Sequence, residues 1–142
     1  MKNALFLLAF FSVPLLDAQV PATLSTDSLP AAGIMVDSSF FDFGTVKQGA
    51  VVKHVFRFTN TGSSPLFIST VKTTCGCTVP DWPKDSVPPG GKGEIKVEFN
   101  TANKSGRQLK VLWVVANTNP AETALQVSGE IKVPKKRKPK GR

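Results

Sequence analysis

The chain has 142 residues, 41% of them hydrophobic, and a formal net charge of +8 at pH 7. Six of its basic residues lie in the last ten positions: Lys135, Lys136, Arg137, Lys138, Lys140 and Arg142. Without these six, Lys2 and Asp17, the 18 basic and 10 acidic residues reduce to 11 and 9 in residues 19–132, a net charge of +2. The length therefore suits one small domain, and the charge distribution leaves that domain nearly neutral and places the basic excess in the tail.

Residues 1–18, MKNALFLLAFFSVPLLDA, have the pattern of a secretory signal peptide: a lysine, an apolar run and a small residue for cleavage. The run from residue 4 to residue 16 is 13 positions long, whereas a helix needs roughly 20 apolar residues to span a bilayer. Pro14 within the run also disfavours a permanent membrane helix; a retained anchor is the alternative. We expect the mature chain to begin near Gln19, to have no transmembrane span and to be periplasmic or extracellular.

Residues 19–33 are rich in Pro, Ser, Thr and Ala and predict a linker before a single domain at residues 34–133. Within that domain apolar and polar residues alternate with period two, as in half-buried strands. The alternating segments are SSFFDFG (38–44), VVKHVFRFTN (51–60), PLFISTVK (65–72), EIKVEFN (94–100), QLKVLWVVAN (108–117) and TALQVSGEI (123–131). The sequence predicts an all-β fold: an immunoglobulin-like antiparallel β-sandwich of about seven strands, followed by a disordered basic tail at residues 134–142.

Four motifs in order carry a resemblance to a known family. They are FDFGTVKQGAVVKHVFRFTNTG, CGCT, GEIKVEFNT and LQVSGEI, within residues 38–132. Together they resemble the bacterial envelope family called domain of unknown function 1573, which is itself similar to immunoglobulin-like modules of the major-sperm-protein and ciliary ASH type. The resemblance implies a secreted or periplasmic sandwich domain, and it implies no established activity.

The segment QLKVLWVVAN has two largely apolar faces. One face holds Leu109, Val111, Trp113 and Val115; the other holds Lys110, Leu112, Val114 and Ala116. The resemblance places a lysine at the strand entrance and buries Leu112 and Val114, so that the other face points outward. An exposed strip of Val111, Trp113 and Val115 indicates a contact site for a partner. The alternative is that the linker or an ordinary rim covers it.

Both cysteines lie in the stretch TTCGCTVPDW, with Gly76 between Cys75 and Cys77. In an extended strand, residues two apart have Cα atoms about 6.5 Å from each other, the outer limit for a disulfide. Gly76 is expected to let the backbone fold tightly enough to close the ring. A structural disulfide or buried thiol pair is favoured over thiol-disulfide exchange, because no basic residue lies within two positions and no helix start is predicted to lower a thiol pKa.

A metal site is the third interpretation of the cysteines. Two thiolates one residue apart suit Cu(I) and rarely complete a zinc site. Only Met35 and His54 could add further ligands in the domain. His54 alternates with Phe56 and Phe58, so we favour a histidine at the edge of the core and expect no bound cofactor.

Enzymatic motifs are otherwise scarce, because the chain has one histidine, no tyrosine and no paired-carboxylate or serine-nucleophile pattern. The basic tail has no interleaved aromatic residue, which argues against single-strand nucleic-acid binding. It is either a solvated tail or a weak, salt-sensitive attachment to anionic surfaces. The sequence thus predicts a non-catalytic module that binds other envelope or extracellular proteins or polysaccharide, through the Trp113 face or an exposed edge strand. Thiol-disulfide exchange or Cu(I) handling at Cys75 and Cys77 is the alternative function.

Overall fold

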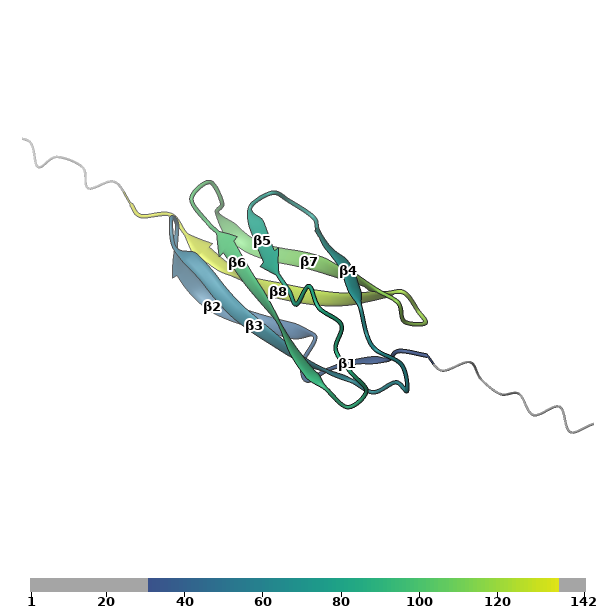
Figure 1. Cartoon of the computed structure of the whole chain (residues 1–142). Helices are drawn as coiled ribbons and strands as arrows, with labels where there is room; N and C mark the ends of the chain where they lie inside the picture. Colours follow the sequence, from purple (N-terminus) through teal and green to yellow (C-terminus); the bar gives the residue numbers. More distant parts are fainter. Residues whose placement is uncertain (1–30, 136–142) are drawn as a thin grey trace, which may run out of the picture.

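The computed structural model describes residues 31–135, which form eight strands and no helix (Figure 1). The strands are β1 (Ile34–Val36), β2 (Phe40–Lys47), β3 (Val51–Asn60), β4 (Ile68–Thr73), β5 (Thr78–Asp81), β6 (Lys92–Asn100), β7 (Gly106–Ala116) and β8 (Glu122–Lys132). The all-β immunoglobulin-like fold expected from the sequence is confirmed. The alternating segments correspond to six of these strands. The other two, β1 and β5, have only three and four residues and are too short to show a period.

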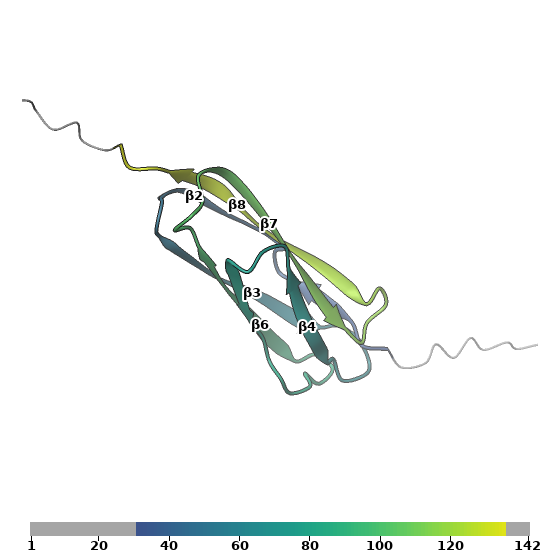
Figure 2. The same cartoon turned by 90° about the horizontal axis from the view of Figure 1, so that it is seen from above.

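The strands form two stacked sheets of four, in the orders β1-β3-β6-β5 and β2-β8-β7-β4 (Figures 1 and 2). Neighbouring strands form six pairs within these sheets, and five of the six are antiparallel. The exception is β2, which runs parallel to β8. It does so because β1 and β2 follow each other without a hairpin: the chain leaves the edge of one sheet at residues 37–39 and continues at the edge of the other.

The core lies between the sheets and follows from the period-two pattern. Alternate side chains of the long strands point inward and are almost fully buried; they are Phe56, Phe58, Ile95, Val97, Leu112, Val114, Leu125 and Val127. The residues between them point outward and are largely polar or charged on β3 and β6. Burying each large apolar side chain contributes about 1.5–3 kcal/mol to the free energy of folding, so the buried faces of these strands are the main source of stability.

The packed domain begins before the expected boundary at residue 34. Ala32 is buried and forms a β-bridge with Thr118, and the amide of Gly33 donates to Asn60. The predicted signal peptide, the linker up to residue 30 and tail residues 136–142 lie outside the described residues. Residues 31 and 135 are at opposite ends of the sandwich (Figures 1 and 2). Within residues 31–135 there is no helix of the length and apolar character that a membrane crossing requires.

Asn60, at the end of β3, is completely buried and uses every polar group of its side chain. Its Nδ2 donates to the carbonyls of Ser64 at 2.8 Å and Val87 at 2.9 Å. Its Oδ1 accepts from the amides of Gly33 at 3.2 Å and Gly62 at 3.0 Å. One side chain therefore connects three segments that are distant in the sequence.

Replacing Asn60 with aspartate (N60D) is expected to lower the free energy of unfolding by about 3–5 kcal/mol. The substitution keeps the shape but removes the donor to the carbonyls of Ser64 and Val87 and places a charge beside them; the carbonyl of Val87 keeps only the amide of Leu66. The matched control is N117D, because Asn117 bridges Phe67 and Pro65 in the same way but is exposed. Denaturant unfolding of both variants checks this; equal losses would contradict the role given to burial.

Candidate functional site

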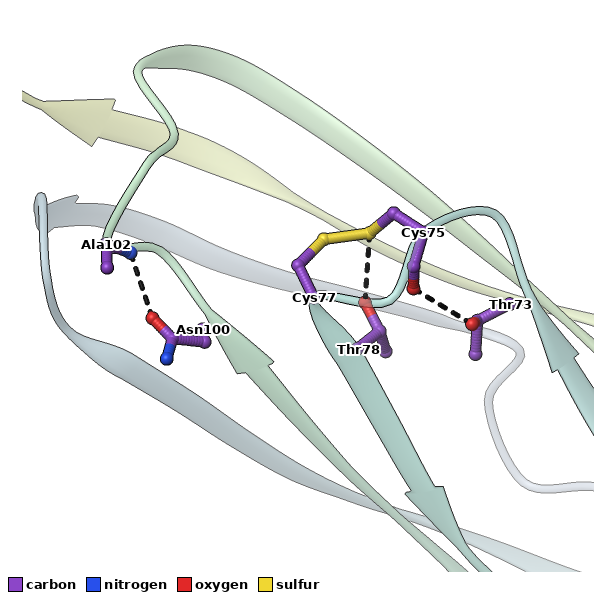
Figure 3. Close-up of a disulfide and its surroundings, with 6 residues drawn as sticks. All are labelled: Thr73, Cys75, Cys77, Thr78, Asn100 and Ala102. Carbon is purple, nitrogen blue, oxygen red and sulfur yellow. Dashed lines mark hydrogen bonds between the residues drawn. A yellow bond between two sulfur atoms is a disulfide. The ribbon is translucent and has the colours of Figure 1, made fainter.

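Cys75 and Cys77 are joined by a disulfide in the turn between β4 and β5 (Figure 3). Their Cα atoms are 5.3 Å apart, closer than in an extended strand, because residues 74–77 turn. Gly76 does not have a positive φ, and a Cβ added to it would meet nothing within 4 Å. The expected steric role of Gly76 is therefore not seen, and the turn accommodates any small residue there.

Hydrogen bonds tie the disulfide turn to the sandwich, and Figure 3 shows the one from Thr73 to Cys75. Thr73 donates its hydroxyl to the carbonyl of Cys75 at 3.0 Å, and the amide of Asn100 donates to the carbonyl of Cys77 at 2.9 Å. Cys77 also packs against a small apolar cluster of Val52, Phe99 and Ile131. Both cysteines are half-buried. The turn thus closes one end of the sandwich beside the start of β5.

A surface pocket of about 470 Å³ lies beside this turn. It is lined by Val51, Gly76, Cys77, Val79, Glu98, Asn100, Ala102, Asn103 and Lys104. Lys104 is a basic residue near the cysteines that the sequence did not reveal, because pairing of β5 with β6 brings the two segments together. A nearby ammonium favours a thiolate, but within the described residues neither cysteine is a free thiol.

Replacing both cysteines with serine (C75S/C77S) is expected to lower the free energy of unfolding by only about 1–2 kcal/mol. A ring closed by residues two apart removes little conformational entropy from the unfolded chain. Denaturant unfolding of the oxidised protein and the double variant measures the difference. The reduced wild type is the control and should match the variant; a chain that no longer folds would contradict the small effect.

His54 packs between the sheets instead of facing the cysteines. Its ring stacks on Phe41 with centroids 3.8 Å apart and meets the edge of Phe56 at 4.6 Å. Desolvation by burial, and then the positive charge of Arg57, lower the pKa of His54. Met35 lies on β1, opposite Thr59 at the other end of β3. Within residues 31–135 no cluster of three or more histidine, cysteine or acidic residues could hold a metal ion.

The lowered pKa of His54 predicts a pH-dependent stability. Below about pH 6.5 the unfolded chain takes up the histidine proton before the folded chain does, so the free energy of unfolding falls as the pH drops from 7 towards 5. The variant H54F keeps an aromatic ring on Phe41 and removes the titration. Its unfolding free energy should change less over this range, by denaturant titration at each pH; parallel profiles would contradict the assignment.

The outer face of the sheet β2-β8-β7-β4 carries the strip expected on β7. Leu112 and Val114 are buried, whereas Leu109 is 58% and Trp113 41% exposed. Val111 and Val115 are half-buried on the same outer face. The predicted direction of the two faces is therefore confirmed. We call Leu109, Val111, Trp113 and Val115 the β7 strip.

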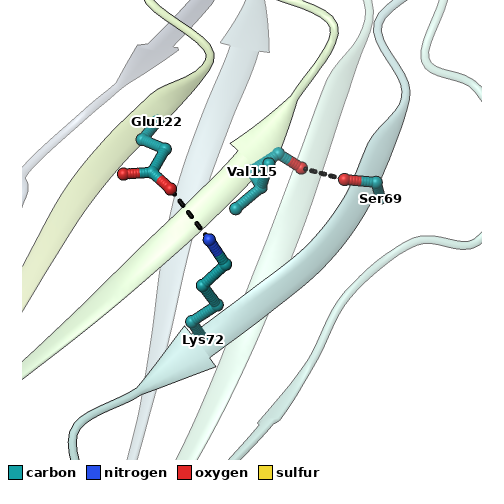
Figure 4. A network of polar contacts seen from close by, with 4 residues as sticks. All are labelled: Ser69, Lys72, Val115 and Glu122. Atoms are coloured by element: carbon teal, nitrogen blue, oxygen red, sulfur yellow. Dashed lines mark hydrogen bonds and ion pairs between the residues drawn. The ribbon is translucent and has the colours of Figure 1, made fainter.

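Charged residues of the neighbouring strands cross one end of the β7 strip (Figure 4). Lys72 on β4 lies beside Trp113, and Glu122 on β8 lies beside Val115. The ammonium of Lys72 is 2.9 Å from Glu122 Oε1, so this ion pair spans β7. The rest of the strip, from Leu109 to Trp113, remains open.

The outer face of the other sheet has a different character. Lys53 pairs with Glu98 at 2.6 Å, and Arg57 pairs with Glu94 at 3.3 Å, across strands β3 and β6. Such exposed pairs contribute little stability, but they neutralise the face. This face also exposes Met35, Val51 and Val79, but the ion pairs of β3 and β6 lie among them. The β7 strip, which fills four successive outward positions of one strand, is therefore the candidate contact surface.

Comparison with known proteins places this geometry in a family. The family described as "Protein of unknown function (DUF1573)" matches residues 34–131. None of the curated proteins is detectably similar in sequence. A solved protein of unknown function from Porphyromonas gingivalis has a TM-score of 0.63 at 15% identity, over 77% of this chain and 51% of that one. The chain thus spans about half the length of that protein.

Two further solved structures share the architecture. The ASH / PapD-like domain of human CEP192 has a TM-score of 0.60 at 11% identity, over 95% of this chain and 99% of that chain. A family 123 glycoside hydrolase from Clostridium perfringens has a TM-score of 0.60 at 10% identity, over 73% of this chain and 27% of that one. At such low identities these likenesses show the fold alone.

Proposed function

The chain belongs to the DUF1573 family of proteins of unknown function, and from this premise we propose that it is a secreted or periplasmic, non-catalytic immunoglobulin-like module that binds other components of the cell envelope. The signal-peptide pattern of residues 1–18 supports export. The absence of paired catalytic groups in the sequence supports a binding role. Partners of this module are envelope or extracellular proteins or polysaccharide.

The β7 strip carries this proposal. Four successive outward positions of β7 hold large apolar side chains, whereas the exposed Met35, Val51 and Val79 of the other sheet lie among ion pairs. A contiguous apolar strip of this kind is typical of a contact surface. Trp113 is the residue type that most often dominates binding energy at such surfaces. The edge strands β2 and β4 border the same face and offer backbone hydrogen bonds as a second mode of recognition.

The basic tail supplements this contact in the proposal by weak attraction to anionic surfaces. Of its basic residues only Lys135 lies within the described part of the chain, and it is exposed. Cu(I) handling receives less support, because the two cysteines are bonded to each other and His54 packs against Phe41. Thiol-disulfide exchange receives less support because, within residues 31–135, no helix start lies beside the cysteines to lower a thiol pKa.

Trp113→Lys is expected to reduce the fraction of the protein retained with the cell envelope several-fold, because it places a charge in the centre of the apolar contact. Val79→Lys is the matched control: Val79 is 64% exposed but lies on the other sheet. Fractionation followed by quantitative immunodetection measures both variants, and a chain ending at Val133 tests the tail in the same assay. Equal retention of the two lysine variants would remove the β7 strip as the binding surface.

A further inference from the structure

One end of the sandwich carries a surplus of positive charge. This end, which we call the tail end, is where β8 leaves the domain beside the turn between β2 and β3 (Figure 1). Its charged residues are the basic Lys47, Lys53, Lys104, Arg107, Lys132 and Lys135 and the acidic Glu98 and Glu130. Residues 31–135 hold 12 basic and 8 acidic residues, so 6 basic and 6 acidic residues lie elsewhere and balance. The whole surplus of the described domain, 12 − 8 = +4, therefore lies at the tail end.

Hydrogen bonds hold three of these lysines on neighbouring segments. Lys47 ends β2 and Lys132 ends β8; the two are exposed cross-strand neighbours. Gln48 donates its backbone amide to the carbonyl of Lys132 at 2.9 Å and its Nε2 to the carbonyl of Lys104 at 3.1 Å. The end of β8, the turn after β2 and the turn before β7 are thereby fixed side by side.

These three lysines are not neutralised within the domain. Among residues 31–135 no carboxylate lies at ion-pair distance from any of them. Of the two carboxylates at the tail end, Glu98 pairs with Lys53, and Glu130 lies beside Arg107. Like charges on adjacent strands repel each other, so the stability of the fold does not explain the lysines that end β2 and β8.

The basic tail continues from the same end. Residues 136–142 follow Lys135 directly and contain five more basic residues. Seven residues span at most about 25 Å when fully extended, so none of these charges can lie farther than that from Lys135. Two exposed apolar side chains are also at the tail end: Val51 is 50% and Val133 54% exposed.

We propose that the tail end docks on the surface of a bilayer that contains anionic phospholipids. This inference deepens the proposed role of the basic tail, on which it rests, and adds the lysines of the domain to it. A flat surface can meet lysines on three separate segments at once, whereas the pocket beside the disulfide contains Lys104 alone of the three. Ammonium groups attract the headgroup phosphates, and exposed valines can enter the interface beside them.

The surroundings of the lysines argue against a nucleic acid as the occupant. A single strand is bound by aromatic side chains on which its bases stack. The exposed aromatic residues among residues 31–135 are Phe40, Phe67 and Trp113, and none of them is at the tail end. Docking by this end also leaves the β7 strip, on the side of the sandwich, free for a partner.

Partition of the purified chain onto extruded vesicles, measured by sedimentation, tests the proposal. The chain is used without residues 1–18, because their apolar run would itself bind lipid. We expect binding to phosphatidylcholine vesicles with about 30% phosphatidylglycerol and none to phosphatidylcholine alone. Binding to the anionic vesicles should weaken at least tenfold from about 0.05 M to about 0.5 M salt.

A triple variant with the tail intact, K47Q/K104Q/K132Q, separates the domain lysines from the tail. It should weaken partitioning about 100-fold, since each lysine near an anionic surface contributes about fivefold. The matched control, K84Q/K92Q/K96Q, removes the same charge from exposed lysines outside the tail end and should change partitioning less than about threefold. The unfolding free energy of the first variant should equal or exceed that of the wild type, because like charges are removed.

No binding to the anionic vesicles, equal binding to both vesicle types, or equal losses in the two triple variants would each overturn the proposal. Binding to an acidic polysaccharide or to DNA without binding to vesicles would overturn it as well, because the partner would then be a polyanion in solution. W113K should leave vesicle binding unchanged. Envelope retention lost in W113K, with no vesicle binding, removes this inference and leaves the β7 strip standing; vesicle binding with normal retention in W113K does the reverse.

Discussion

The buried side chain of Asn60 holds the end of the sandwich on which the rest of the architecture depends. Its Nδ2 donates to the carbonyls of Ser64 and Val87, and its Oδ1 accepts from the amides of Gly33 and Gly62. Its backbone also exchanges hydrogen bonds with Gly90 and Gly91. Because a buried polar group is costly unless it is paired, this arrangement fixes one position for each segment. The first residues of the domain are thereby locked against β3, and Ala32 can close on Thr118.

Much of this fold could be predicted from the alternation of apolar and polar residues, because each long strand has one buried face. β3 and β6 show it most clearly, since their outward residues are charged and pair across the strands. The short strands β1 and β5 could not be found in this way: three or four residues show no period, and Pro80 lies within β5. The parallel pairing of β2 with β8 depends on a non-local choice of edge, which local patterns do not contain.

Only some residues of the candidate sites could be predicted from the sequence. The spacing of Cys75 and Cys77 limits the chemistry to a few alternatives, but the pocket beside them is lined by Lys104, which only the pairing of β5 with β6 brings near. Both faces of β7 are largely apolar, so its own sequence does not show which face points into the core. The resemblance to the family indicated that Leu112 and Val114 do. The flanking Lys72 and Glu122 follow from strand register, which depends on the whole sheet.

The composition of β7 explains why its outer face points to a partner. A strand that is apolar on both faces is typical of sheets covered on both sides. Here Leu112 and Val114 already fill the core, so the core does not require a tryptophan at position 113 on the other side, where it is 41% exposed. The neighbouring strands place polar or charged side chains on that face, including Lys72 and Glu122. The second apolar face of β7 is therefore best explained by burial against a surface that the domain itself does not provide.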